Sequence, residues 1–169
     1  MSARLVPGVN GCLLVGTNLA TTIAGRSHPL RVGAPSDREF FAALRSQADL
    51  ILVGGKTFMA EPYRHTPVPL AIYATSNLLA VKSNPVARMV SGEISDVISK
   101  LRDSFGGEPK ILCEGGPTLI SALIQMELLD QLFLSRSTLN GDSDFFDVDQ
   151  TKKMLLVSSS DVLDHFRKQ

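Results

Sequence analysis

The sequence feature that most constrains the fold is the stretch Lys-Ile-Leu-Cys-Glu-Gly-Gly-Pro-Thr-Leu at residues 110–119. An apolar run short enough for a buried strand ends in Glu-Gly-Gly, and Pro117 then opens a predicted helix. Two glycines permit positive φ and leave room for a ligand, while the N–H groups and dipole of a helix start favour an anion. Pro117 suits the first helical turn because its missing donor would have had no partner there. The motif predicts either a phosphate cradle or an ordinary tight turn, and glycine content alone does not decide between them.

A second predicted strand ends in the same way. The unbroken apolar run at residues 50–53 fits a central strand covered on both faces, and Gly54-Gly55-Lys56-Thr57 follows it. Two such turns would place two sets of backbone donors along one sheet edge, which suits the pyrophosphate of a dinucleotide. The pattern has neither the spacing of a Walker loop nor the single-loop fingerprint of a Rossmann fold. Lys56 is a candidate to neutralise a phosphate, although a solvated lysine is the commoner outcome.

The remaining apolar patterns predict alternating strands and helices. Further strands are predicted at residues 9–15, 70–74, 86–90, 110–113, 128–134, 154–158 and 162–166, the last two as an antiparallel hairpin. Helices are predicted at 36–48, where Ser36 and Glu39 have capping-box spacing, at 94–101 and at 117–126. Residues 25–35 show no period and are predicted to form a loop. We therefore predict one α/β domain over residues 1–169, with a mainly parallel sheet and antiparallel C-terminal strands.

Polar residues follow two of these strands. Thr17 and Asn18 come after the first strand, and the ligand crevice of an open α/β sheet lies at such strand ends. Thr75 and Ser76 follow the strand at 70–74, where hydroxyls can bind a ribose or its phosphate. All four residues are equally typical of turns. The acidic stretch at 140–144 lacks the ligand spacing of a calcium loop and is predicted to be a solvated turn.

Composition excludes several classes of partner and site. Seventeen basic and seventeen acidic residues balance, so neither nucleic acid nor an anionic membrane surface is an expected partner. No apolar stretch is long enough to span a bilayer, and the N-terminus has no signal-peptide pattern, so we expect a soluble, cytoplasmic protein. The two cysteines, Cys12 and Cys113, lie in apolar runs and are too few for a zinc site of their own, so no metal is predicted.

Two motifs in a fixed order identify a family. The first is Ala-Asp-Leu-Ile-Leu-Val-Gly-Gly-Lys-Thr at residues 48–57, followed by Glu61 and a proline. The second is Leu-Cys-Glu-Gly-Gly-Pro-Thr-Leu at 112–119, followed by Leu129 and Asp130. With these motifs the chain resembles the reductase domain of riboflavin biosynthesis, the pyrimidine-reductase branch of the dihydrofolate-reductase-like fold. The resemblance extends from about residue 13 to residue 134 and implies a three-layer structure with helices on both faces of the sheet.

The resemblance implies NADPH-dependent reduction of a ribosylaminopyrimidine phosphate to its ribitylamino form. It implies a catalytic role for Glu114 beside the sugar and substrate contacts from Glu61 and Arg64, together with Thr17 and Asn18 at the first strand end. In such an enzyme the cofactor carries the hydride chemistry, while the protein orients it and supplies charge and protons. The implied cofactor-binding residues are Gly54, Gly55, Lys56, Thr57, Thr75, Ser76, Gly115, Gly116, Pro117 and Thr118.

One departure from the family pattern concerns the substrate end. The family's first strand ends in Ser-Leu-Asp-Gly, whose aspartate reaches the substrate, but the aligned residues here are Asn-Leu-Ala-Thr at 18–21. Ala20 can neither accept a side-chain hydrogen bond nor move a proton. Glu114 is the nearest candidate to replace the lost acid, with Glu61 behind it.

Other functions are weighed against the reductase. A dihydrofolate reductase is disfavoured because the chain has no tryptophan, and because we expect the helix after the first strand to lack an acidic residue. A catalytically silent NADP-binding or partner-binding homologue is supported by Ala20 and Thr21. The resemblance also implies a homodimer, for which the apolar run at 154–157 would suit the interface. No zinc-deaminase motif is present in the sequence.

Overall fold

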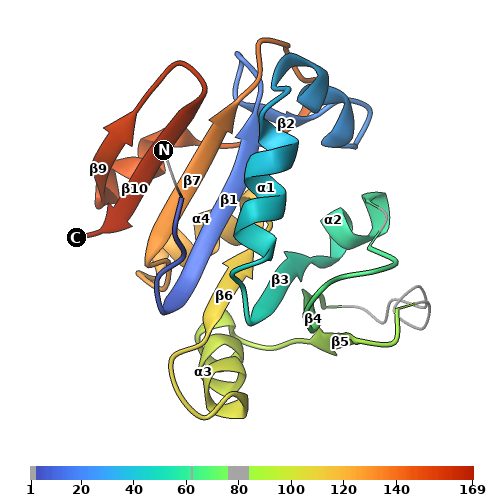
Figure 1. Ribbon diagram of the computed structural model, residues 1–169, viewed down its shortest axis with the longest axis vertical. Helices are drawn as coiled ribbons and strands as arrows, with labels where there is room; N and C mark the ends of the chain where they lie inside the picture. Colours follow the sequence, from blue (N-terminus) through green and yellow to red (C-terminus); the bar gives the residue numbers. More distant parts are fainter. Residues whose placement is uncertain (1–2, 62, 76–83) are drawn as a thin grey trace.

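A computed structural model describes residues 3–61, 63–75 and 84–169 of the chain. Its main sheet has eight strands in the order β5-β4-β3-β6-β1-β7-β10-β9 (Figure 1). The strands are β1 (Gly8–Val15), β3 (Leu50–Gly54), β4 (Leu70–Tyr73), β5 (Ala87–Val90), β6 (Lys110–Cys113), β7 (Gln131–Arg136), β9 (Met154–Ser159) and β10 (Leu163–Lys168). All pairings are parallel except those of β10, which is antiparallel to both β7 and β9. The predicted mainly parallel sheet with a closing C-terminal hairpin is therefore confirmed.

The sheet is covered on both faces. Helix α1 (Asp37–Arg45) lies in front of it in Figure 1, and Leu44 packs there with Cys12 and Leu112. Helices α3 (Ile94–Ser104) and α4 (Pro117–Gln125) pack on the opposite face, where they contribute to the largest apolar cluster. All eight residues of β1 are buried, as a central strand covered on both faces requires. The fold belongs to the dihydrofolate-reductase-like class that the resemblance implied.

Helix α1 differs from its prediction at both ends. Ser36 makes no side-chain capping hydrogen bond, because its backbone is already helical, with φ −77° and ψ −13°. A capping serine takes extended backbone angles, so the predicted capping box is wrong. The helix also ends at Arg45 rather than at residue 48. Before it, the predicted loop at 25–35 contains a short 3-10 helix, η1 (His28–Gly33).

Strand β7 begins at Gln131, three residues after its predicted start at residue 128. The segment between Gln125, where α4 ends, and Gln131 begins with a turn and belongs to neither element. Glu127 has a left-handed φ of 55°, and the Leu128 N–H donates to the Leu123 carbonyl at 2.9 Å, which satisfies one of the last helix carbonyls. The apolar pair at 128–129 was therefore misassigned to the strand because a helix end and a buried strand start share the same composition.

A second, two-stranded sheet was not predicted. Strands β2 (Ala20–Thr22) and β8 (Ser143–Phe145) pair antiparallel, although about 120 residues separate them in the chain. The acidic stretch predicted to be a solvated turn thus enters a strand. Two further short elements, α2 (Gly55–Ala60) and η3 (Val148–Lys153), complete the described structure. We call the two strands together the β2–β8 corner.

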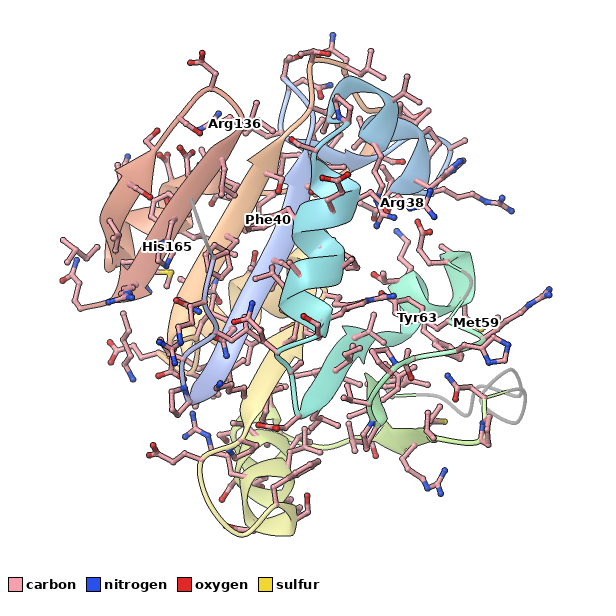
Figure 2. All side chains as sticks on the ribbon, viewed as in Figure 1. Arg38, Phe40, Met59, Tyr63, Arg136 and His165 are labelled. Atoms are coloured by element: carbon pink, nitrogen blue, oxygen red, sulfur yellow. The ribbon has the colours of Figure 1, made fainter. Side chains whose placement is uncertain are left out.

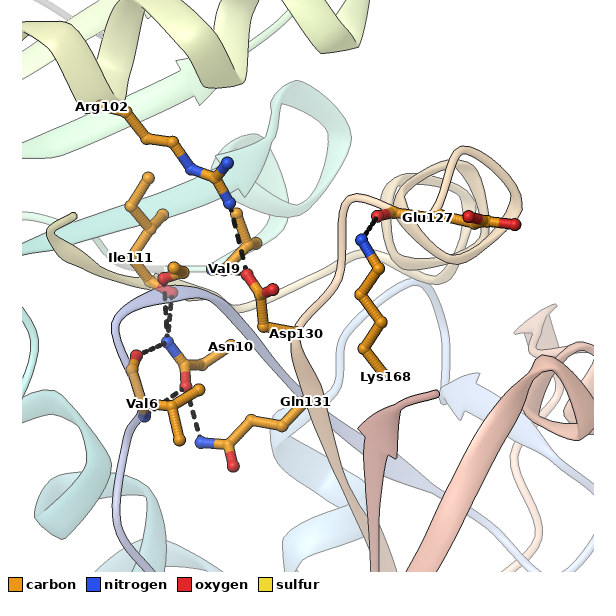
Figure 3. A network of polar contacts seen from close by, with 10 residues as sticks. Val6, Val9, Asn10, Arg102, Ile111, Glu127, Asp130, Gln131 and Lys168 are labelled. Atoms are coloured by element: carbon orange, nitrogen blue, oxygen red, sulfur yellow. Dashed lines mark hydrogen bonds and ion pairs between the residues drawn. The ribbon is translucent and has the colours of Figure 1, made fainter.

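Buried polar groups form a hydrogen-bond network at the end of the sheet at which β1 begins (Figure 3). Asn10 is fully buried, and its amide donates to the Val6 carbonyl at 2.9 Å and to the Ile111 carbonyl at 3.2 Å, while its oxygen accepts from Gln131 at 2.6 Å. The Asp130 carboxylate accepts from the Val9 N–H at 2.7 Å. These bonds join β1 to both of its neighbours, so the network serves the fold at the end of the sheet away from the glycine turns.

In the parts of the chain that the structure describes, no helix is long and apolar enough to cross a bilayer.

Candidate active site

The two glycine turns predicted from the sequence lie side by side. Strands β3 and β6 are neighbours, so their carboxyl ends meet at one edge of the sheet. The Gly54 N–H donates to the Gly115 carbonyl at 2.8 Å, which joins one turn directly to the other. The predicted placement of both turns along one edge is confirmed. We call the set of Gly54, Gly55, Gly115 and Gly116 the glycine edge.

A side chain at Gly115 or Gly116 of the glycine edge would press on a neighbouring residue. Gly115 has φ +87°, a conformation that favours glycine, and the peptide bond between Gly115 and Gly116 is cis. A Cβ on Gly116 would lie 2.9 Å from Thr57 Oγ1, and one on Gly115 would lie 3.3 Å from Leu13 Cδ1. The edge is therefore a backbone surface shaped to accept a ligand closely.

A cavity of about 1010 Å³ opens over the glycine edge and extends along α1. Its volume lies at the upper end of the range of about 300–1,000 Å³ that is typical of ligand pockets. Seven of the ten predicted cofactor residues line it: Gly54, Gly55, Lys56, Thr57, Gly116, Pro117 and Thr118. Gly115 lies in the turn behind them, Thr75 is exposed and does not line the cavity, and Ser76 lies outside the described residues.

The carboxylate of Glu114 is built into the cavity wall. Arg45 donates to it twice, from Nε at 2.6 Å and from Nη2 at 2.7 Å, and the Tyr63 hydroxyl donates at 2.8 Å. The Glu114 side chain is 0% exposed, whereas that of Arg45 is 28% exposed. Glu114 is thus held in place by Arg45 and Tyr63, and its catalytic role stays a prediction.

Electrostatics strengthen this three-residue group. Burial raises the pKa of Tyr63 far above its usual value, and the adjacent Glu114 charge raises it further. Burial alone would lower the pKa of Arg45, but the hydrogen bond to Glu114 and the nearby negative charges, chiefly that of Glu114, together outweigh it, so the net pKa is raised. The Arg45 guanidinium also lies 4.7 Å from the centre of the Phe41 ring. Tyr63 therefore stays a neutral donor and Arg45 stays charged throughout the working pH range.

The predicted substrate residues are only partly brought together. Glu61 lines the cavity, and its Oε1 accepts from both the N–H and the hydroxyl of Ser27, each at 2.8 Å. Thr17, Asn18 and Arg64 do not line the cavity. Thr17 and Asn18 are hydrogen-bonded instead to the segment at 140–141, as turn residues would be.

Ala20, the departure from the family pattern, is fully buried in the β2–β8 corner. It pairs with Phe145, and a Cβ built on Gly141 would lie 2.6 Å from the Ala20 Cβ. The backbone at Gly141 therefore fills the space into which a longer side chain at position 20 would extend. The β2–β8 corner is thus closed around an alanine side chain.

Several cavity residues were missed by sequence reasoning. Arg26, Arg31 and Arg38 line the cavity with Asp37, and Figure 2 shows Arg38 on α1 and Tyr63 beside α2. Arg31 Nε lies 3.5 Å from Asp37 Oδ2, and the Asp37 side chain is only 6% exposed. Burial raises the pKa of the Asp37 carboxyl, although Ser135 and Arg31 oppose the shift. The expectation that the helix after the first strand lacks an acidic residue is wrong, because Asp37 and Glu39 lie in the first turn of α1 and Asp37 lines the cavity.

The two cysteines are buried within the sheet. Burial raises the pKa of Cys12 well above its usual value and that of Cys113 to about 12. Among the described residues, no group of three or more His, Cys, Asp and Glu side chains is placed to hold a metal ion.

Comparison with protein families decides the relationship. A model of the RibD C-terminal domain matches residues 18–139, which is most of the chain. The chain belongs to the RibD C-terminal domain family. This confirms the resemblance to the reductase domain of riboflavin biosynthesis that the two glycine motifs indicated.

Solved structures share the fold of this RibD C-terminal domain at low sequence identity. A pyrimidine reductase-like protein from Corynebacterium diphtheriae is 16% identical with a TM-score of 0.72, over 95% of this chain and 91% of that one. A dihydrofolate reductase from Enterococcus faecalis, complexed with NADP(H), is 12% identical with a TM-score of 0.69, over 96% and 97% of the two chains. A deaminase/reductase from Thermotoga maritima is 16% identical with a TM-score of 0.66, and 57% of its length is matched by 96% of this chain. No curated protein matches the chain.

Proposed function

We propose that this RibD C-terminal domain is a cytoplasmic, NADPH-dependent reductase that acts on a ribosylaminopyrimidine phosphate or a closely related small substrate. The observation that carries the proposal is the meeting of two glycine turns in one cavity. Each turn alone is common, but a joined pair lining a cavity of about 1010 Å³ suits a dinucleotide next to a second ligand.

The residues present fit the phosphates of NADPH. A Cβ on Gly116 would collide with Thr57, so the backbone there is kept bare where a pyrophosphate would approach. Gly116 is also the N-cap of the nine-residue helix α4, whose dipole favours an anion at this end. Lys56 lines the same cavity and adds a positive charge. When bound, the nicotinamide supplies the hydride, and these residues would bind and orient the cofactor.

Two arginine side chains in the cavity favour the binding of an anionic substrate. Arg26 and Arg38 line the cavity on exposed positions, and no ion pair to either is found among the described residues. We assign the substrate phosphate to these two side chains rather than to Arg64, which lies off the cavity. The group of Glu114, Arg45 and Tyr63 also lines the cavity, and we assign the sugar of the substrate to a position against this group.

Calorimetry with NADPH, followed by absorbance assays of NADPH oxidation with the aminopyrimidine ribosyl phosphate, tests the proposal. We expect saturable cofactor binding and substrate-dependent turnover that is lost in Glu114→Gln. No binding at millimolar NADPH would overturn the proposal. Binding without turnover, unaffected by Glu114→Gln, would instead favour the catalytically silent homologue.

Dihydrofolate reduction is a second candidate because of Asp37. A buried carboxyl with a raised pKa on the first helix can hold a proton beside a heterocyclic ligand. Methotrexate separates the candidates: tight binding, abolished by Asp37→Asn, would favour dihydrofolate, and absence of binding would favour the pyrimidine.

Strand β9 supports a homodimer. It is the outer strand of the sheet, and Leu155, Leu156 and Val157 are 58%, 52% and 47% exposed. Three consecutive exposed apolar residues on an unpaired edge invite association with another strand. Analytical ultracentrifugation should show a dimer that Leu155→Lys/Val157→Lys dissociates, while Val32→Lys, at another exposed apolar position, leaves it intact. A monomeric wild-type protein at micromolar concentration would overturn this assignment.

A further inference from the structure

Four carboxylates line the cavity, and three of them are already held by the fold. Glu114 is enclosed by Arg45 and Tyr63. The Asp37 side chain is 6% exposed beside Arg31. The fourth, Asp144, belongs to β8 and pairs with Lys56, whose side chain is 79% exposed.

Glu61 is the third of the held carboxylates. It receives two hydrogen bonds from Ser27, which tie the end of α2 to the segment before η1. Using Glu61 for substrate would release that tie. Asp144 differs because its cationic partner is solvated and can turn towards a cofactor phosphate while the carboxylate stays in place.

The backbone of the β2–β8 corner places the Asp144 side chain at the cavity. Ala20 pairs with Phe145 and Thr22 with Ser143, so Asp144 lies opposite Thr21. Its φ of +54° is left-handed and breaks the alternation of side chains along the strand. As a result its Oδ2 accepts from Thr22 Oγ1 at 3.1 Å on the cavity side.

Thr21 fixes this unusual backbone. Its hydroxyl donates to the Asp144 carbonyl at 2.6 Å, and Thr21 itself is only 3% exposed. A left-handed aspartate held by a buried hydrogen bond is a positioned group rather than a mobile loop residue. The Asp144 side chain is nevertheless 21% exposed, so a ligand in the cavity can reach it.

We infer that Asp144 is the carboxylate that recognises the substrate. The inference rests on the proposed function and deepens it. A carboxylate only accepts hydrogen bonds, so Asp144 selects a ligand that presents O–H or N–H donors at this point. The hydroxyls of a pentose phosphate are such donors, whereas an apolar group has none. Its contact with Lys56 places that sugar next to the cofactor phosphates.

The test compares wild type, Asp144→Asn and Asp142→Asn. Asp142 is a matched control because it carries the same charge in the same loop but is fully exposed and bonds the Ala24 N–H outside the cavity. We measure calorimetric binding of ribose 5-phosphate and of NADPH, and the KM for the aminopyrimidine ribosyl phosphate. Asp144→Asn should weaken ribose 5-phosphate binding and raise the KM by about 10-fold, the loss expected for one hydrogen bond to a charged group.

The same variant should bind NADPH as well as the wild type or better, since it releases Lys56. Asp142→Asn should match the wild type in all three measurements. Unchanged ribose 5-phosphate binding in Asp144→Asn, or no binding by the wild type, overturns the inference. A parallel loss of NADPH affinity in Asp144→Asn also overturns it, because the residue would then only position Lys56. Failure of the proposed function is separate, because it appears as absent NADPH binding in the wild type.

Discussion

The glycine edge and the β2–β8 corner face the same cavity but are specified in different ways. The glycine edge consists of two contiguous motifs, each complete within ten residues, on strands that pair directly. The β2–β8 corner joins residues 20–22 to residues 143–145, and neither segment alone has strand periodicity. The comparison teaches that the part of the cavity proposed for the cofactor can be predicted from local sequence, whereas the part proposed for the substrate depends on contacts between distant segments.

The largest effect on stability is expected from the ion pair between Arg45 of α1 and Glu114, the residue directly before the glycine turn of β6. Arg45→Met would leave the fully enclosed Glu114 carboxylate without its cation, and breaking a buried pair in this way costs about 3–5 kcal/mol. Urea unfolding measures the change. Arg102→Met is the matched control, because its contact with Asp130 is 3.3 Å long and both side chains are partly exposed, so its loss costs about 0–1 kcal/mol. Similar losses in both variants would show that the glycine edge does not depend on α1.

The glycine edge itself is tested with Gly116→Val. The new side chain would meet Thr57 Oγ1 and fill the surface proposed for the pyrophosphate, so NADPH affinity should fall by about 100-fold, or ~2.7 kcal/mol. Calorimetry measures the affinity, and circular dichroism checks the fold. Gly107→Ala, at an exposed turn with nothing within 4 Å, should bind NADPH as the wild type does. Equal NADPH affinities in the two variants would show that the glycine edge does not bind the cofactor.

The β2–β8 corner is tested with Thr21→Val. This nearly isosteric change removes the buried donor to the Asp144 carbonyl and should lower the free energy of unfolding by about 1 kcal/mol. It should also raise the KM for substrate while NADPH affinity stays unchanged. Thr138→Val, at an exposed hydroxyl with a long 3.4 Å bond, serves as the control. A loss of NADPH affinity in Thr21→Val would mean that the corner and the glycine edge are not separable.

The smallest effect concerns the pH dependence contributed by Asp37. Its pKa is higher in the native than in the unfolded state, so the native state binds more protons between the two values. The stability of the wild type should therefore fall relative to Asp37→Asn as pH rises through this interval, and the difference should become constant above it. Urea unfolding at a series of acidic to neutral pH values measures this slope. A slope of opposite sign would indicate that the Arg31 contact outweighs burial.

These contrasts explain which predictions succeeded. The parallel strands, the C-terminal hairpin and the joined glycine turns followed from continuous apolar runs and from glycines whose neighbours lie within a few residues. The left-handed Asp144, the closure around Ala20 and the cavity-facing Asp37 did not, because each depends on which distant backbone covers it. The start of β7 was misplaced for a related reason, since Leu128 contributes to a helix end that only the three-dimensional path reveals.

The close packing of Gly141 against Ala20 makes the two positions epistatic. Ala20→Asp alone would press a carboxylate against the backbone at residue 141, so this substitution is expected to destabilise the β2–β8 corner. A longer side chain at position 20 therefore requires a compensating change in the segment at 139–145. The two positions cannot be altered independently of each other.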